Sequence, residues 1–140
     1  MNIIGGVFMI FTFGDTFNPS SSGAEPELLW TYAYPNANYE FGATTVALDL
    51  SKYEAVMITA KLHYEETKPT SYGYFRKDSQ RYNLITVEGG TNPYWRAINV
   101  TDTGVIIGSC RIGNTNYTND TYCKPLKIYG IAKDISKSMT

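Results

Sequence analysis

Residues 44–64 read TTVALDLSKYEAVMITAKLHY, and apolar side chains alternate with other residues in two runs of this stretch. Alternation with a period of two is typical of extended strands that turn one face toward a core. Residues 51–54 separate the runs and predict a tight reversal, so we expect a hairpin of two strands. Its inward side chains are Val46, Leu48 and Leu50 in the first run and Val56, Ile58, Ala60 and Leu62 in the second.

The composition limits both the fold class and the partners. The chain has 140 residues, with 12 tyrosines and 12 glycines, and it lacks the Leu-rich or Ala-rich periodicity of helices. Its 12 basic and 13 acidic residues leave a formal charge of -1. This balance lacks the basic footprint that nucleic acids and anionic membranes attract, so we expect neither as a partner.

The rest of the chain also reads as strands joined by turns. We expect a turn at Asp102, Thr103 and Gly104, with Gly104 at positive φ, between two strands of the clearest hairpin. Residues 65–74 predict a long surface loop. About seven strands and no helix predict an all-β fold, an antiparallel β-sandwich of jelly-roll type over residues 27–132. The further strands are expected at residues 28–32, with Trp30 in the core, and at 82–87, 94–101, 105–112 and 125–131.

The N-terminal segment is strongly apolar. No Lys or Arg precedes Lys52, which argues against a secretory signal, and the apolar run at residues 7–13 is too short to cross a bilayer. We therefore predict an extended N-terminal arm for attachment or oligomerisation, joined by a Pro- and Ser-rich linker, over residues 1–26. A polar tail is expected at residues 133–140. The arm would bury Phe8, Ile10, Phe11 and Phe13 against another subunit or protein.

No group of residues predicts catalysis or a metal site. His63 is the only histidine and falls on the polar face of its strand, which favours a surface position. The loop with Asn114, Asn116, Asn119 and Asp120 offers oxygen atoms, but only one of these residues is ionised, so calcium is disfavoured. The carboxylates Glu65, Glu66, Asp78 and Asp102 are scattered through turns. We predict no enzymatic activity, no cofactor and no metal.

Cys110 and Cys123 lie at the ends of two predicted strands, where they could face each other. A disulfide between them would stabilise the fold by roughly 3 kcal/mol. Free thiols packed as small apolar groups are the alternative, and we favour it for a protein made in a reducing cytoplasm.

The aromatic residues in or beside predicted loops are the best candidates for binding. A flat ring can stack on a sugar or anchor a protein contact at low entropic cost. Trp95 is the leading candidate, although strand alternation could equally turn it inward. The near-zero net charge favours neutral sugars over charged polymers. The candidate ligand-binding residues are Tyr72, Tyr74, Tyr94, Trp95, Arg96 and Tyr117, with Tyr122 nearby.

Four pieces of the chain, in this order, resemble a known type of domain. They are LWT at residues 29–31, VALDLSKYEAV at 46–56, VTDTGV at 100–105 and KPLKIYGI at 124–131. Together they are similar to a small domain in tail and virion-surface proteins of phages and prophages of Gram-positive and gut bacteria. The similarity spans residues 27–131 and includes no catalytic signature.

This resemblance implies a multimeric phage structural protein, such as a tail-fibre, baseplate or head-fibre/decoration subunit. It implies location in the virion and assembly in the bacterial host cytoplasm. We expect a homotrimer or other symmetric oligomer, contacts to other virion proteins through the arm, and possible contact with a host-surface glycan. The alternative is a carbohydrate-binding, lectin-like module.

Overall fold

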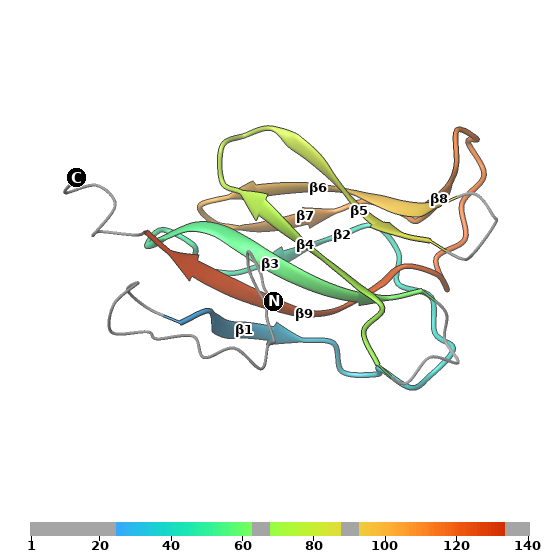
Figure 1. Cartoon of the computed structure of the whole chain (residues 1–140), viewed down its shortest axis with the longest axis horizontal. Coiled ribbons are helices and arrows are strands. Elements are labelled where there is room, and N and C mark those ends of the chain that lie inside the picture. The colour runs from blue at the N-terminus through green and yellow to red at the C-terminus, as the bar shows by residue number, and fades with distance from the viewer. Residues whose placement is uncertain (1–24, 63–67, 88–92, 134–140) are drawn as a thin grey trace. The chain divides into compact units, whose positions relative to one another are not determined.

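The computed structural model describes residues 25–62, 68–87 and 93–133. Within these ranges the chain forms strands and no helix, and Pro26–Lys133 make one compact unit. Two antiparallel sheets pack face to face (Figure 1), which confirms the predicted all-β sandwich. Several predicted features lie outside the described residues: the arm side chains Phe8, Ile10, Phe11 and Phe13, the carboxylates Glu65 and Glu66, His63, and residues 134–140.

The first sheet, sheet A, has the strand order β1-β9-β3-β4. Each neighbouring pair is antiparallel, and β3 lies between β9 and β4. The strands of sheet A are β1 (Glu27–Thr31), β3 (Tyr53–Lys61), β4 (Ser71–Arg76) and β9 (Lys124–Ala132).

The second sheet, sheet B, has the order β2-β7-β6-β5, and the short strand β8 also pairs with β6. Since β5 lies on one side of β6 and β7 and β8 on the other, β6 is the central strand of this sheet. Its strands are β2 (Thr44–Ala47), β5 (Arg81–Thr86), β6 (Tyr94–Thr101), β7 (Gly104–Ile107) and β8 (Arg111–Ile112).

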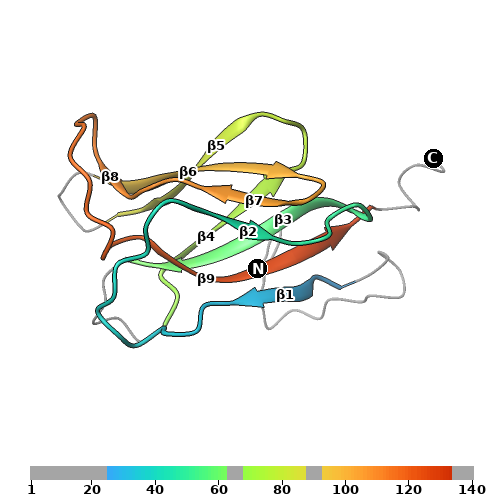
Figure 2. The ribbon, with the colours of Figure 1, turned by 180° about the vertical axis from the view of Figure 1, so that it is seen from behind.

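Strands far apart in the sequence pair in both sheets. The first strand pairs with the last, β1 with β9, and β2 pairs with β7 (Figure 2). This nesting makes the sandwich jelly-roll-like, whereas β3–β4 and β5–β6–β7 pair with their neighbours in sequence.

The core lies between the sheets and contains most of the predicted side chains. Leu62, predicted with them, is only partly buried and lies after the end of β3, so its predicted core position is wrong. Leu50, Val56, Ile58 and Ala60 are fully buried, and Val46 is buried beside them. Trp30 and Leu48 are partly buried and pack against this cluster. The other large apolar contributors are Phe41, Tyr53, Phe75, Leu84, Ile98, Val100, Val105, Ile107 and Ile128.

The predicted hairpin between the runs at residues 46–50 and 56–62 is wrong. β2 pairs with β7 in sheet B, whereas β3 pairs with β4 and β9 in sheet A, so residues 48–52 connect the two sheets. Alternation shows which face of a strand is buried, and two strands facing each other across a core have the same pattern as two paired strands.

Two other boundaries differ from the prediction. The last four residues of the predicted loop at residues 65–74 belong to strand β4, whose Phe75 faces the core. The single strand expected at residues 105–112 is broken into β7, which ends at Ile107, and β8, which begins at Arg111. Between them, the backbone N–H of Gly108 donates to the carbonyl oxygen of Ala97 on β6.

Gly104 ends the β6–β7 turn but does not have the positive φ that was expected. Its role is close packing, because a Cβ atom built on Gly104 would overlap the carbonyl oxygen of Val46 on β2. A glycine is therefore needed here for the approach of the neighbouring strand rather than for the turn.

Candidate functional site

Strand β6 directs its side chains alternately into the core and out to the surface. Arg96, Ile98 and Val100 are buried, whereas Trp95 is only partly buried. Trp95 pairs with Ile85 of β5, which is exposed, so its indole lies on the outward face of sheet B. This placement decides between the two orientations that alternation left open for Trp95.

Arg96 is not available to a ligand, and its prediction as a ligand-binding residue is wrong. The side chain is fully buried and donates five hydrogen bonds, all to backbone carbonyl oxygens. Burial lowers the pKa of the guanidinium, and Asp120 lies 3.7 Å away as a partial counter-charge. The acceptors are Cys123 and Phe41 at 2.7 Å, Gly108 at 3.0 Å, Tyr122 at 3.1 Å and Asp120 at 3.2 Å.

Two lysines support the same end of the sandwich from within. Lys61 and Lys124 are cross-strand partners on β3 and β9, and both are buried. The ammonium of Lys61 donates to the carbonyl oxygen of Pro35, and that of Lys124 donates to Ala37 at 2.9 Å. Desolvation, followed by the charge of Lys61, lowers the pKa of Lys124. These two hydrogen bonds connect strands β3 and β9 to the loop after β1 and hold this loop in place.

On the outward face of sheet B, two cations meet the indole of Trp95. The guanidinium carbons of Arg81 on β5 and Arg111 on β8 each lie 6.0 Å from the centroid of its ring. The indole Nε1 donates to the carbonyl oxygen of Gly113 at 2.8 Å, which fixes the ring orientation. These cation–π contacts hold both arginines close to the ring from opposite sides of β6.

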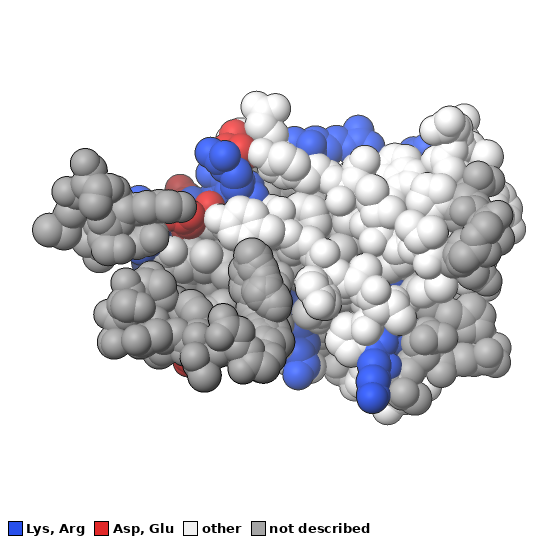
Figure 3. Space-filling model, in the orientation of Figure 1, with Lys and Arg blue, Asp and Glu red and all other residues white. Residues whose placement is uncertain are grey.

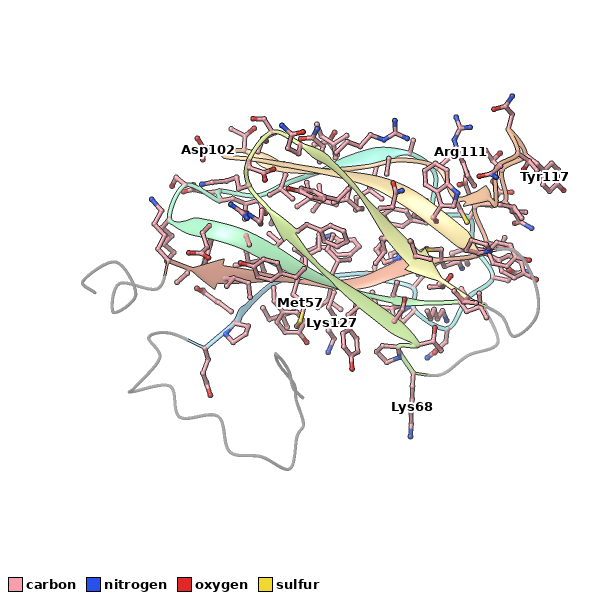
Figure 4. All side chains as sticks on the ribbon, turned by 45° about the horizontal axis from the view of Figure 1, so that its top comes forward. Met57, Lys68, Asp102, Arg111, Tyr117 and Lys127 are labelled. Carbon is pink, nitrogen blue, oxygen red and sulfur yellow. The ribbon has the colours of Figure 1, made fainter. Side chains whose placement is uncertain are left out.

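The loop after β8 completes this surface. Arg111 Nη1 donates to Asn116 Oδ1 at 3.3 Å, and the neighbouring Tyr117 is 66% exposed. Figure 4 shows Arg111 and Tyr117 projecting from the same end of the sandwich, far from Asp102 at the opposite end of β6. We call these residues, Arg81, Trp95, Arg111, Asn116 and Tyr117, the Trp95 surface.

The remaining predicted binding residues lie elsewhere. Tyr72 and Tyr74 are exposed on β4 and pair with Thr59 and Met57 on the outward face of sheet A. Figure 4 shows Met57 and Lys127 projecting from this face. Tyr94 is partly buried and stacks on Tyr122, with ring centroids 4.4 Å apart. The predicted aromatic cluster therefore separates into three places: Tyr72 with Tyr74, Tyr94 with Tyr122, and Trp95 with Tyr117.

Sequence reasoning gave no binding role to Arg81, which it placed in a mixed-charge cluster at a solvated edge, or to Arg111. The signal was cross-strand pairing: Arg111 lies directly opposite Trp95, and both neighbours of β6 contribute to the same face. It also missed Tyr34 and Tyr39, which are 56% and 57% exposed, with ring centroids 5.3 Å apart. This pair continues inward through Tyr32 to Phe41 beside Arg96.

The polar groups of the loop at residues 114–121 bond within the protein. Asp120 Oδ1 accepts from the backbone of Cys110 at 2.8 Å, and Asn119 Oδ1 accepts from Thr121 at 2.6 Å. In the described ranges, no group of three or more His, Cys, Asp or Glu side chains could hold a metal ion. The same part of the chain contains no helix long and apolar enough to cross a membrane.

Both cysteines are buried free thiols, as favoured from the sequence. Burial raises the pKa of the Cys110 thiol to about 12 and that of the Cys123 thiol to about 11. A thiol with so high a pKa is almost fully protonated at neutral pH and is a poor nucleophile, so neither residue is suited to covalent catalysis.

Comparison with known proteins found no match: no protein-family model, no curated protein and no solved structure is significantly similar to this chain.

Proposed function

We propose that this chain is a phage virion structural protein, a tail-fibre, baseplate or head-fibre/decoration subunit, that contacts the host surface through the Trp95 surface. The observation that carries the proposal is the outward tryptophan of β6, which is held between two arginines on an ordered sheet. Aromatic rings and arginines at defined positions are the groups that contribute most of the energy in protein recognition.

The interior of the same end supports a binding role. Arg96 ties together the loops before β2, after β7 and before β9, because its five acceptors lie in these segments. A ligand that meets loops already held in place loses less conformational entropy on binding. The Trp95 surface rests on this preorganised end.

Assembly is the second part of the proposal. The subunit forms a homotrimer or other symmetric oligomer and attaches to other virion proteins through its arm, in which Phe8, Ile10, Phe11 and Phe13 are the contact residues. Its place is the virion surface, after synthesis in the bacterial host cytoplasm. The apolar composition of the arm supports this assignment.

An independent carbohydrate-binding module is the second candidate. The exposed pair Tyr34 and Tyr39 favours it, because two neighbouring tyrosine rings on a supported loop offer a stacking platform for a sugar. Such a module acts without assembly into a virion.

Two measurements on the full chain test the proposal. Light scattering should give the mass of an oligomer, and isolated host envelopes should retain the parent protein but not Trp95→Ala. Tyr72→Ala is the matched control, since this exposed aromatic lies on the other sheet. A monomer that binds envelopes would favour the lectin-like module, and envelopes that retain neither protein would exclude a host contact.

A further inference from the structure

We infer that the Trp95 surface binds an acidic glycan, whose carboxylate or phosphate groups are held by Arg81 and Arg111 while its sugar ring contacts Trp95 and Tyr117. This inference rests on the proposed function and specifies the ligand of the same surface. It differs from the neutral sugars expected from the net charge of the whole chain.

Arg81 and Arg111 lack a negative partner within the described part of the chain. Neither makes an ion pair there, and among the described residues their only side-chain hydrogen bond joins Arg111 to the neutral amide of Asn116. Other cations of the sandwich do find carboxylates, as in the pairs Lys77–Asp102 at 2.7 Å and Arg76–Asp78 at 3.8 Å. Two arginine forks therefore remain available to an external anion.

The outward face of sheet B likewise carries positive side chains without negative ones beside them. The outward positions of sheet B carry no Asp or Glu, whereas two of them are arginines. In Figure 3, Lys and Arg side chains lie along the upper edge of the molecule, where sheet B lies, and also project from its lower edge, whereas the visible Asp and Glu lie toward the left end. The outward positions are Thr45, Ala47, Arg81, Asn83, Ile85, Trp95, Ala97, Asn99, Thr101, Gly104, Ile106 and Arg111.

The geometry places both cations within reach of one ligand. Each guanidinium carbon lies 6.0 Å from the centre of the same indole, so a sugar beside this ring meets both. Two like charges held near one ring repel each other, and an anion bound between them relieves that repulsion. The bonds from Trp95 to Gly113 and from Arg111 to Asn116 keep the groups oriented before a ligand arrives.

The same observations disfavour the other ligand classes. A neutral sugar could accept hydrogen bonds from the two guanidiniums but would lack the charge attraction that a carboxylate or phosphate group adds. A nucleic acid needs a basic stripe that follows several phosphates, and this surface offers two cations on a chain of formal charge -1. A glycan with spaced acidic groups and apolar ring faces matches two arginines on one tryptophan.

Binding of defined probes to the full chain tests the inference. The probes are oligogalacturonate, its methyl ester, a phosphorylated neutral oligosaccharide and a single-stranded oligonucleotide, each measured by titration calorimetry. We expect one or both acidic glycan probes to bind, the ester to bind at least about tenfold more weakly, and added salt to weaken the binding. The relative affinities for oligogalacturonate and the phosphorylated oligosaccharide show whether carboxylate or phosphate is preferred.

Three variants locate the site. Arg81→Gln and Arg111→Gln should each weaken the acidic probe about tenfold or more. Arg76→Gln removes the same charge from an exposed position on sheet A and should leave binding unchanged. Equal loss in Arg76→Gln would show a general charge effect and overturn the inference.

Other outcomes separate this inference from the proposed function. Equal affinity for the ester and the acid, binding of neither acidic glycan, or tighter binding of the oligonucleotide would each overturn the acidic glycan. Each of these results leaves the proposed host contact intact, provided that envelopes retain the parent protein but not Trp95→Ala. If no envelope retains the parent, the proposed function fails whatever the probes show.

Discussion

Trp95 and Arg96 are adjacent on β6 but lie on opposite faces of sheet B. The indole faces outward between two guanidiniums, whereas the Arg96 guanidinium is fully buried and bonded to five carbonyl oxygens. One strand therefore combines the candidate contact residue with the side chain that orders the loops around it.

Replacing Arg96 by methionine should destabilise the fold by at least about 3 kcal/mol, because each buried carbonyl left without a partner costs about 1–3 kcal/mol. Chemical denaturation measures this loss. Arg111→Met removes a guanidinium that is not fully buried and that makes one cation–π contact and one side-chain hydrogen bond, so it should change the free energy of unfolding by about 1 kcal/mol or less. Equal stability of the two variants would contradict the role assigned to Arg96.

Ile58→Ala should lower the free energy of unfolding by about 2–5 kcal/mol, because Ile58 is fully buried on the core face of β3. Ile106→Ala is the matched control, since Ile106 is 45% exposed on the outward face of sheet B, and we expect a much smaller change. Denaturation midpoints at constant slope give both values. An Ile58→Ala protein as stable as the parent would refute the register of β3.

Gly104→Ala should cost about 1–3 kcal/mol, because the added Cβ overlaps backbone of β2 that cannot move without breaking its pairing with β7. Gly42→Ala meets no atom closer than Asp120 Oδ2 at 4.0 Å and should be close to neutral. Thermal unfolding of the two variants compares them directly, and a neutral Gly104→Ala would show that β2 is free to shift.

The stability of the fold should decrease at alkaline pH. The hydrogen bond from Tyr53 to Glu27, with burial as the second cause, raises the pKa of Tyr53 from 10.0 to about 12. A pKa raised by folding means that the unfolded chain loses its proton first, so this contribution is present below pH 10 and is lost as the pH rises toward about 12.

Tyr53→Phe should therefore show a smaller loss of unfolding free energy between pH 10 and about pH 12 than the parent does. Partial desolvation of the half-exposed Tyr74 side chain, followed by the charge and hydrogen bond of Glu54, raises the pKa of Tyr74 to about 12 as well, so Tyr74→Phe serves as the comparison. Denaturation at several pH values measures the difference. An identical pH dependence in the parent and both variants would contradict these shifts.

The thiols of Cys110 and Cys123 should resist alkylation in the folded protein, since both are buried and their pKa values are raised to about 12 and about 11. Mass spectrometry after iodoacetamide treatment should show no addition to the native protein and one adduct on each cysteine after denaturation. Rapid labelling of the native protein would show that this end of the sandwich opens.

Period-two alternation correctly predicted that Val56, Ile58 and Ala60 of β3 are buried, and the bounds of β6 matched the expected strand. For β6, alternation left open which face is buried, and the structure places Arg96, Ile98 and Val100 in the interior. Alternation could not identify strand partners, so β2 and β3 were expected to pair although they belong to different sheets. Strand β4 was missed because its Gly73, with Pro69 and Thr70 before it, resembles a turn.

The candidate site was harder to predict because its parts come from separate strands. Trp95 was identified as an aromatic residue near a loop, but Arg81 and Arg111 join it only through pairing on both sides of β6. Arg96 was misassigned because charged residues are usually exposed, and its acceptors come from segments between residues 41 and 123. The residues near Arg96 in the sequence do not reveal that distant loops bring five carbonyl oxygens to its side chain.

All five hydrogen bonds of Arg96 go to main-chain oxygen atoms, and every residue type supplies one. Apart from Asp120 and Phe41, whose side chains also contact the guanidinium, the loops that carry the five acceptors can therefore exchange their side chains while these bonds stay intact, provided that their backbone path is kept. Tyr39 and Tyr117 lie close in sequence to these acceptors and point their rings to solvent. The hydrogen bonds that hold these loops thus do not depend on the side chains that the loops expose. New contact surfaces can therefore arise by substitution while the backbone of this end keeps its conformation.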